Sequence, residues 1–183
     1  GLVALMEIQA SRTRARLGER GAPVLLLDQN RVLWDRVLIG HGLAALERAE
    51  GLGPLGPYGL QASIAACHAR ATTAEGTDWA RIAALYAVQA FVTPSPVVEL
   101  NRAVAVSMAE GPAAGLAMLD ALRGEPALAE YHLMPSVRGD LLAKLGRNGE
   151  ARLEFERAAS LTKNAREREL LLRQAAAMKS ANS

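Results

Sequence analysis

The chain has little of several residue types that often carry function. It holds one cysteine, Cys67, among 183 residues, so it forms no internal disulfide and no multi-cysteine metal site. A chain without disulfides is typical of a reducing cytoplasm, which we expect as its location. Only 4% of the residues are aromatic, and no apolar run approaches the roughly 18 residues of a membrane-spanning helix, so no membrane contact is expected.

The chain also lacks a strong charge of either sign. It carries 21 basic and 19 acidic residues, a net charge of +2, whereas a DNA-binding domain usually has a larger basic excess or a basic stripe. The one local excess is the group Arg12, Arg14, Arg16 and Arg20. Residues two apart do not share a helix face, so solvated charge at a helix end is favoured over a contact with nucleic-acid phosphate.

No catalytic or metal-binding spacing is present. The histidines, His41, His68 and His132, lie far apart in the sequence, and none belongs to a metal-binding motif. Cys67 and His68 are neighbours whose side chains diverge on a helix, which favours a buried cysteine beside a half-exposed histidine. There is no nucleophile elbow and no phosphate-binding glycine loop. The sequence therefore predicts no catalytic residue, no metal, no cofactor and no enzymatic activity.

The chain does have helical periodicity almost throughout, carried by alanine and leucine, and this predicts an all-α fold. A break at 51–57, GLGPLGP, divides residues 1–56 from residues 57–183. We expect a loop over about 18–23, N-terminal caps at Asp78, Ser95 and Asn148, and a kink or restart after Met134 because Pro135 follows. The predicted helices cover about 2–17, 31–50, 58–74, 77–92, 96–109, 112–123, 127–145, 148–162 and 165–180.

The loops carry a repeat. Gly76, Gly111 and Gly146 are each 35 residues apart and lie between predicted helices, where a left-handed residue is expected. A period of about 34 residues is typical of tetratricopeptide helix pairs. The third unit fits this pattern at Gly139, Leu142, Gly146, Ala151, Phe155 and Ala158. We predict antiparallel helix pairs stacked as a tetratricopeptide-like right-handed solenoid of about eight or nine helices, with 165–180 as a polar capping helix.

One stretch, LLLDQNRVLWDRVLI from Leu25 to Ile39, is dense in polar residues. It fits an active site, a docking surface, or a helix entry with a packed tryptophan. Asp28 or Asn30 suits a helix cap, and Asp35 lies four residues after Arg31, where the two side chains pair on a helix. The structural interpretation is favoured. The candidate interaction or structural residues of this stretch are Asp28, Arg31, Trp34, Asp35 and Arg36.

A second polar group opens the predicted helix 96–109. Asn101, together with Arg102, is a candidate for contact with the backbone of a bound peptide. The alternative is an ion pair between Glu99 and Arg102, three residues apart, with Asn101 bonded to a nearby loop. The second interpretation is favoured, because such solvated pairs occur on any helix.

Five segments together resemble a known family: LLLDQNRVLWDR, GPYGLQASIAACHA, TDWARIAALY, PSPVVELNRAVAV and GPAAGLAMLDAL. In this order they are similar to the C-terminal, tetratricopeptide-like extension of a group of extracytoplasmic-function RNA polymerase sigma factors. That group is associated with small DGPF-containing, YCII-related proteins. The family pattern has aspartate where Asn30 stands and an uninterrupted helix where Pro135 stands.

The resemblance implies a function that the residues alone do not. The full-length protein would be a bacterial transcription initiation factor whose preceding sigma regions bind core RNA polymerase and promoter DNA. The chain, which starts like the middle of a helix, is then expected to be its regulatory or protein-interaction part. Its partners would be those sigma regions, polymerase, or another protein or peptide. The competing hypothesis is a stand-alone tetratricopeptide-like peptide-binding scaffold with Asn101 in its groove. An enzyme would need a pocket that joins a histidine to carboxylates.

Overall fold

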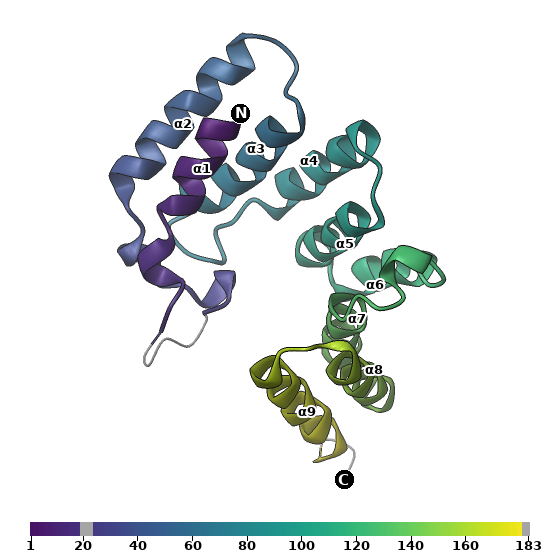
Figure 1. Ribbon diagram of the computed structural model, residues 1–183. Helices are drawn as coiled ribbons and strands as arrows, with labels where there is room; N and C mark the ends of the chain where they lie inside the picture. Colours follow the sequence, from purple (N-terminus) through teal and green to yellow (C-terminus); the bar gives the residue numbers. More distant parts are fainter. Residues whose placement is uncertain (19–23, 181–183) are drawn as a thin grey trace. The chain divides into compact units, whose positions relative to one another are not determined.

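The computed structural model describes residues 1–18 and 24–180 and confirms the predicted all-α fold (Figure 1). Over those residues the chain forms nine α-helices and a few short 3-10 helices, and no strand. It divides into two compact units, Gly1–Pro94 and Ser95–Ser183. The predicted boundary between residues 56 and 57 falls inside the first unit, between two of its helices. None of the helices in the described part of the chain is long and apolar enough to cross a membrane.

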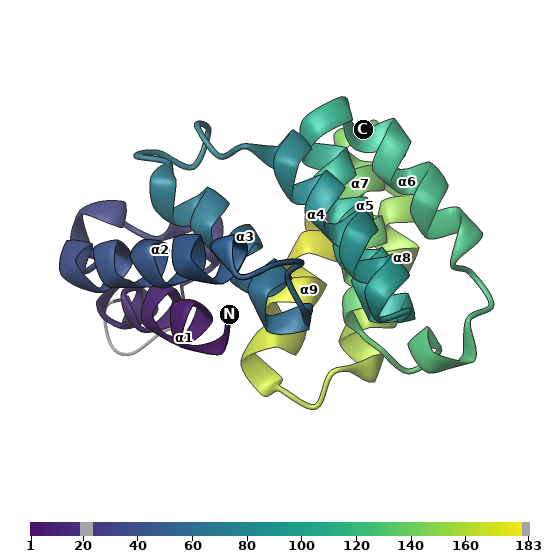
Figure 2. The ribbon, with the colours of Figure 1, turned by 90° about the horizontal axis from the view of Figure 1, so that it is seen from above.

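The first unit is built around one buried helix. Its helices are α1 (Leu2–Ala10), α2 (Arg36–Gly51), α3 (Pro57–Arg70) and α4 (Trp79–Val92). α1, α2 and α4 all pack against α3, as Figure 2 shows for α1 and α2. Residues 62–69 of α3 are consequently all buried. Most of them are small, which lets the neighbouring helices approach closely.

A glycine sets the distance between α1 and α2. A Cβ atom at Gly42 would lie 2.6 Å from Cγ1 of Ile8, closer than carbon atoms normally approach. At Gly40, one half-turn earlier in the same helix, a Cβ atom would meet nothing within 4 Å. Gly42 is therefore required for packing, whereas Gly40 is not.

Two predicted helix boundaries in the first unit are wrong. The helix expected over 2–17 ends at Ala10 and is followed by the 3-10 helix η1 (Thr13–Ala15). The helix expected from Arg31 begins at Arg36, after the 3-10 helices η3 (Leu26–Asp28) and η4 (Arg31–Leu33). The extended backbone at Trp34 and Asp35 ends η4 before α2 begins. Residues 19–23, which include Arg20 and most of the predicted loop, lie outside the described residues.

The second unit is a row of consecutively packed helices. It contains α5 (Pro96–Glu110), α6 (Pro112–Ala121), the 3-10 helix η5 (Pro126–Leu128), α7 (Leu133–Lys144), α8 (Asn148–Leu161) and α9 (Ala165–Ser180). Each of these α-helices packs mainly against its neighbours in the sequence, which confirms the solenoid-like stacking of helix pairs within this unit. The large side chains of its core include Leu100, Leu116, Leu119, Leu141, Leu142 and Phe155.

The repeat is clearest in the pair α7–α8, as predicted. A Cβ atom at Gly139 would lie 2.9 Å from the ring of Phe155, so the small residue lets the aromatic side chain pack on α7. Gly111 and Gly146 have positive φ angles of 103° and 73°, as expected for residues that leave a helix. Gly76 lies between α3 and α4, as predicted, but its φ angle is not positive: α3 already ends at Arg70, and Gly76 lies in a separate turn.

The predicted caps and the proline break have mixed outcomes. Asp78 caps α4, because its Oδ1 accepts from the backbone N–H of Arg81 at 2.9 Å. Ser95 makes no side-chain cap bond, and Asn148 lies inside α8 as its first residue. The helix predicted over 127–145, with a kink or restart after Met134, is η5 followed by a separate α7 that starts at Leu133, so the restart comes just before Met134. Pro135 therefore lies in a first turn, where its missing N–H removes no helical hydrogen bond.

Candidate functional site

The polar stretch 25–39 centres on a buried arginine. The side chain of Arg31 is 5% exposed, and its guanidinium donates to the carbonyl oxygens of His68 and Ala71, the latter at 2.9 Å. A further bond, 3.1 Å long, reaches Oγ1 of Thr77. The two carbonyls lie at the C-terminal end of α3, where backbone acceptors lack helical partners and a cation is favoured. Arg31 thus caps α3 and holds the start of the 71–78 turn.

Trp34 packs beneath two arginines. It is 3% exposed, and the guanidinium carbons of Arg31 and Arg12 lie 5.0 Å and 5.7 Å from its ring centroid. Cations at such distances interact favourably with an aromatic ring. The packed tryptophan of the favoured interpretation is therefore confirmed, and two arginines, one of them from outside the stretch, lie over its ring.

His68 lies in the same cluster. Its ring makes an edge contact with Trp79 at 5.2 Å between centroids. Burial, together with the nearby charges of Arg31 and Arg12, lowers the pKa of His68 from 6.5 to about 4, so the imidazole is neutral near pH 7. The expected half-exposed histidine is instead 8% exposed. Its neighbour Cys67 is buried, as expected, and burial raises the pKa of its thiol.

The acids of the stretch do not pair with Arg31. Oδ1 of Asp35 accepts from the backbone N–H groups of Val37 and Leu38, so Asp35 is the N-cap of α2. Its predicted pairing with Arg31 is wrong, because the intervening chain is not one continuous α-helix. Asp28 is an exposed member of η3 and caps no α-helix, whereas Asn30 caps η4. Arg36 is exposed at the first position of α2.

The arginines that follow α1 are solvated to different degrees. Arg12 is partly buried, and burial together with the charges of Arg16 and Arg31 lowers its pKa to about 10, so it stays charged at neutral pH. Arg14 and Arg16 are exposed, and Arg16 donates to Gln9 at 3.0 Å. The guanidinium groups of Arg12 and Arg16 lie close together, because both donate to Oε1 of Gln9.

The second predicted group has only the first half of the favoured arrangement, the Glu99–Arg102 pair. Nη1 of Arg102 lies 3.4 Å from Oε2 of Glu99, which forms the expected ion pair on α5. Asn101 is exposed, and no hydrogen bond of its side chain is found among the described residues. The pair is partly exposed and contributes little stability.

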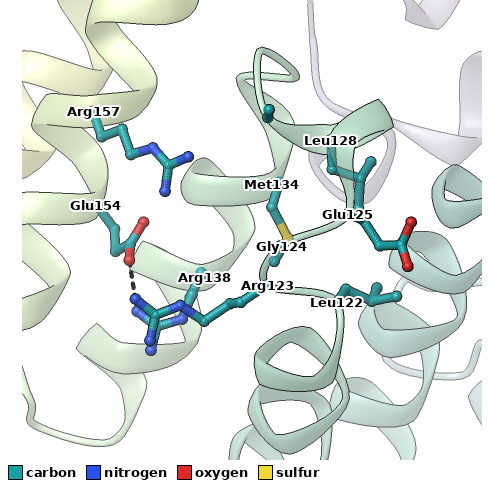
Figure 3. A pocket seen from close by; sticks show the side chains of 10 residues that line it. Leu122, Arg123, Gly124, Glu125, Leu128, Met134, Arg138, Glu154 and Arg157 are labelled. Carbon is teal, nitrogen blue, oxygen red and sulfur yellow. Dashed lines mark hydrogen bonds and ion pairs between the residues drawn. The ribbon is translucent and has the colours of Figure 1, made fainter.

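A pocket in the second unit was not predicted. It has a volume of about 190 Å³ and lies where the 122–129 segment passes α7 and α8. Figure 3 shows Arg123, Arg138 and Arg157 projecting toward it, with Met134 and Leu128 on the opposite side. Arg138 is 6% exposed. Its guanidinium lies 2.9 Å from Oδ1 of Asp120 on α6 and 2.6 Å from Oε1 of Glu154 on α8.

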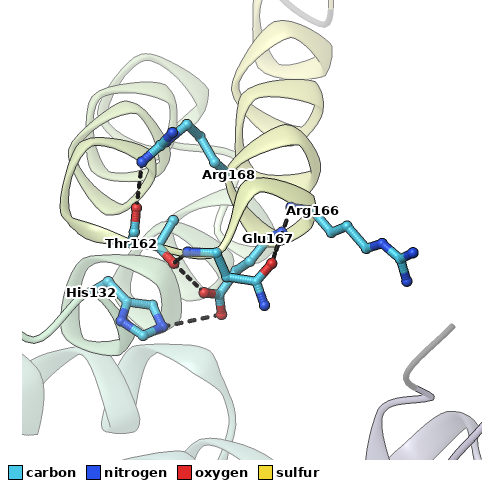
Figure 4. A network of polar contacts seen from close by, with 6 residues as sticks. His132, Thr162, Arg166, Glu167 and Arg168 are labelled. Atoms are coloured by element: carbon cyan, nitrogen blue, oxygen red, sulfur yellow. Dashed lines mark hydrogen bonds and ion pairs between the residues drawn. The ribbon is translucent and has the colours of Figure 1, made fainter.

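A polar network joins the starts of α7 and α9 (Figure 4). Oε1 of Glu167 lies 3.1 Å from Nε2 of His132, and its other oxygen accepts from the hydroxyl of Thr162. Arg168 donates to the carbonyl oxygen of Thr162 at 2.7 Å and so satisfies an acceptor at the end of α8. Asn164 caps α9 through the N–H groups of the next turn. The network fixes the turn between α8 and α9.

Comparison with known proteins finds similar sequences but no function. Residues 1–50 match the model of a family of unknown function, DUF6596. An uncharacterized protein from Rhizobium meliloti (strain 1021) is 52% identical over 167 residues, which are 91% of this chain. The chain spans 39% of the length of that relative. No solved structure matches the chain significantly.

Proposed function

We propose that the chain is the regulatory, protein-interaction C-terminal part of a bacterial RNA polymerase sigma factor and acts in the cytoplasm. Its contacts would be with the sigma regions of the same protein, with core polymerase, or with a further protein or peptide. Promoter DNA would be contacted only by those sigma regions. The cytoplasmic location follows from this role and from the single buried cysteine.

One observation carries the proposal. Three of the five segments that resemble the sigma-factor extension meet in the cluster around Arg31. The first supplies Arg31 and Trp34, the second supplies His68, and the third supplies Thr77 and Trp79. Segments that resemble one family and pack into one buried cluster are the expected result of descent from one folded domain. The residues that carry the resemblance are therefore also residues that pack in the first unit.

In the proposed mechanism the chain acts by positioning the sigma regions. The helix pairs form a scaffold that holds the sigma regions in, or releases them to, an arrangement that polymerase accepts. Arg31 makes this scaffold rigid, because it joins η4, the end of α3 and the 71–78 turn through buried hydrogen bonds. A rigid scaffold loses little conformational entropy when a partner binds. More of the free energy of the contacts therefore appears as free energy of binding.

A promoter reporter tests this function. The full-length factor is compared with a version truncated before Gly1, each with core polymerase and a target promoter. We expect the truncated factor to bind polymerase but to lose most transcription. A matched variant, Gly40→Ala, should retain wild-type transcription because a Cβ atom there meets nothing within 4 Å. Normal transcription by the truncated factor would exclude the regulatory role.

The second candidate function is a stand-alone peptide-binding scaffold. It is favoured by the pocket beside α7 and α8, which combines arginines with apolar side chains. The coding sequence upstream of Gly1 separates the two functions. Two helical, arginine-rich sigma regions there support the first, and a start codon near residue 1 supports the second.

A further inference from the structure

We propose that the pocket between the 122–129 segment, α7 and α8 binds an acidic peptide segment in which an apolar residue flanks the acid. Arg123 and Arg157 would bind the carboxylate, and Leu122, Leu128 and Met134 would contact the apolar side chain. The inference rests on the proposed protein-interaction function and names the chemistry of the partner.

The charges of the pocket are the first argument. Arg123 and Arg157 are exposed, and neither forms an ion pair with a carboxylate among the residues that the structure describes. Both line the same pocket and project toward it from different elements, the 122–129 segment and α8 (Figure 3). Guanidinium groups bind carboxylates through paired, charge-assisted hydrogen bonds. Two of them at one opening favour an anionic ligand.

The nearby acids do not occupy these two arginines. Asp120 and Glu154 both bind the buried guanidinium of Arg138, at 2.9 Å and 2.6 Å. Glu125 lines the pocket, but in Figure 3 its carboxylate points away from the arginines. A carboxylate that arrives from outside therefore finds little competition within the pocket.

The size and apolar lining of the pocket favour a peptide over a cofactor. Its volume of about 190 Å³ is below the roughly 300–1,000 Å³ of clefts that enclose drug-sized ligands and cofactors. It suffices for one or two side chains. Leu128 and Met134 are buried side chains at its inner wall, and such a surface stabilises an apolar group that leaves water. A small dicarboxylate would leave this wall unused.

Titration followed by nuclear magnetic resonance tests the proposal on the intact 19.4 kDa chain. The probe is a capped peptide, Ser-Gly-Leu-Glu-Leu-Gly-Ser, and its matched controls replace the glutamate by glutamine or both leucines by alanine. We expect amide shifts centred on 122–129 and on the Arg157 turn of α8. Each control peptide should bind at least about fivefold more weakly. Glutarate, which offers carboxylates without leucine side chains, should likewise bind more weakly than the peptide.

Substitutions locate the site. Arg123→Gln and Arg157→Gln should each weaken binding by roughly fivefold to tenfold. Arg166→Gln, at an exposed arginine on α9, is the matched control and should leave binding unchanged. Unperturbed spectra away from the pocket show that each variant is folded. Three results would each overturn the proposal. The peptide binds both arginine variants as tightly as the wild type, the amide shifts are the same without the glutamate, or glutarate binds as tightly as the peptide.

The outcome is separable from that of the reporter experiment. Binding that requires Arg123 and Arg157 supports the acidic-peptide site even if truncation before Gly1 leaves transcription normal. Conversely, a chain that is essential for transcription but does not bind the peptide retains the proposed function and loses this site.

Discussion

Replacing Arg31 with methionine tests whether a buried cation stabilises the first unit. Methionine keeps most of the length of the side chain but removes its charge and its donors. The substitution leaves the carbonyl oxygens of His68 and Ala71 and the hydroxyl of Thr77 without this partner. It also removes a cation 5.0 Å from the ring centroid of Trp34.

The expected magnitude follows from these contacts. A hydrogen bond to a charged group contributes about 1.5–3 kcal/mol, and a buried acceptor left without a partner costs about 1–3 kcal/mol. Three such bonds would sum to well above 4 kcal/mol, but removing Arg31 also removes the cost of burying its charge. We therefore expect the free energy of unfolding of the first unit to fall by about 3 kcal/mol.

Chemical denaturation followed by tryptophan fluorescence measures this change, because both tryptophans, Trp34 and Trp79, belong to the first unit. Arg31→Lys should lose nearly as much, since an ammonium group donates from a single nitrogen and cannot span the acceptors that the two terminal guanidinium nitrogens reach. Arg36→Met, at an exposed arginine, is the control and should change stability by less than about 0.5 kcal/mol. An Arg31→Met protein as stable as the wild type would refute the argument that this cation caps α3.

Three further changes test the same unit. Trp34→Ala should lower the free energy of unfolding by roughly 3–5 kcal/mol in the same denaturation assay; an unchanged value would indicate an exposed docking role. Because the folded pKa of His68 is about 4 and its ordinary value is 6.5, stability is complete above pH 6.5 and falls by up to roughly 3 kcal/mol toward pH 4. His68→Phe should remove that part of the pH dependence. In thermal melts, Gly42→Ala should destabilise by about 1–2 kcal/mol through its clash with α1, whereas Gly40→Ala should stabilise by about 0.5–1 kcal/mol; two shifts of equal sign would contradict the packing argument.

The sequence predicted those parts of the fold that depend on residues close together in the chain. Helical periodicity predicted the helices, and the glycine spacing predicted the positive φ angles at Gly111 and Gly146. The third repeat was found because small and aromatic residues face each other across one turn, at Gly139 and Phe155. The boundaries near residue 31 were wrong because Asn30 and Asp35 both cap, so the 3-10 helix η4 and the α-helix α2 replace one continuous helix.

The contacts of the candidate sites depend on distant residues and were not predictable. The partners of Arg31 lie 37, 40 and 46 residues further along the chain, whereas sequence spacing pointed to Asp35, which is only four residues away. Arg138 meets acids 18 residues before it and 16 residues after it, on two other helices. No helical spacing relates these positions. Only the stacking of α6, α7 and α8 brings them together, so the pocket beside them had no local signal.

The packing of each α-helix mainly on its neighbours in the second unit has a consequence for synthesis. Contacts that are close in sequence form quickly, because little chain entropy is lost in closing short loops. Once α5 and α6 have left the ribosome, they can therefore pack on each other before the rest of the unit is made. Each later helix can pack on the helix made just before it. The unit is thus suited to fold during translation, in the order in which its helices are made.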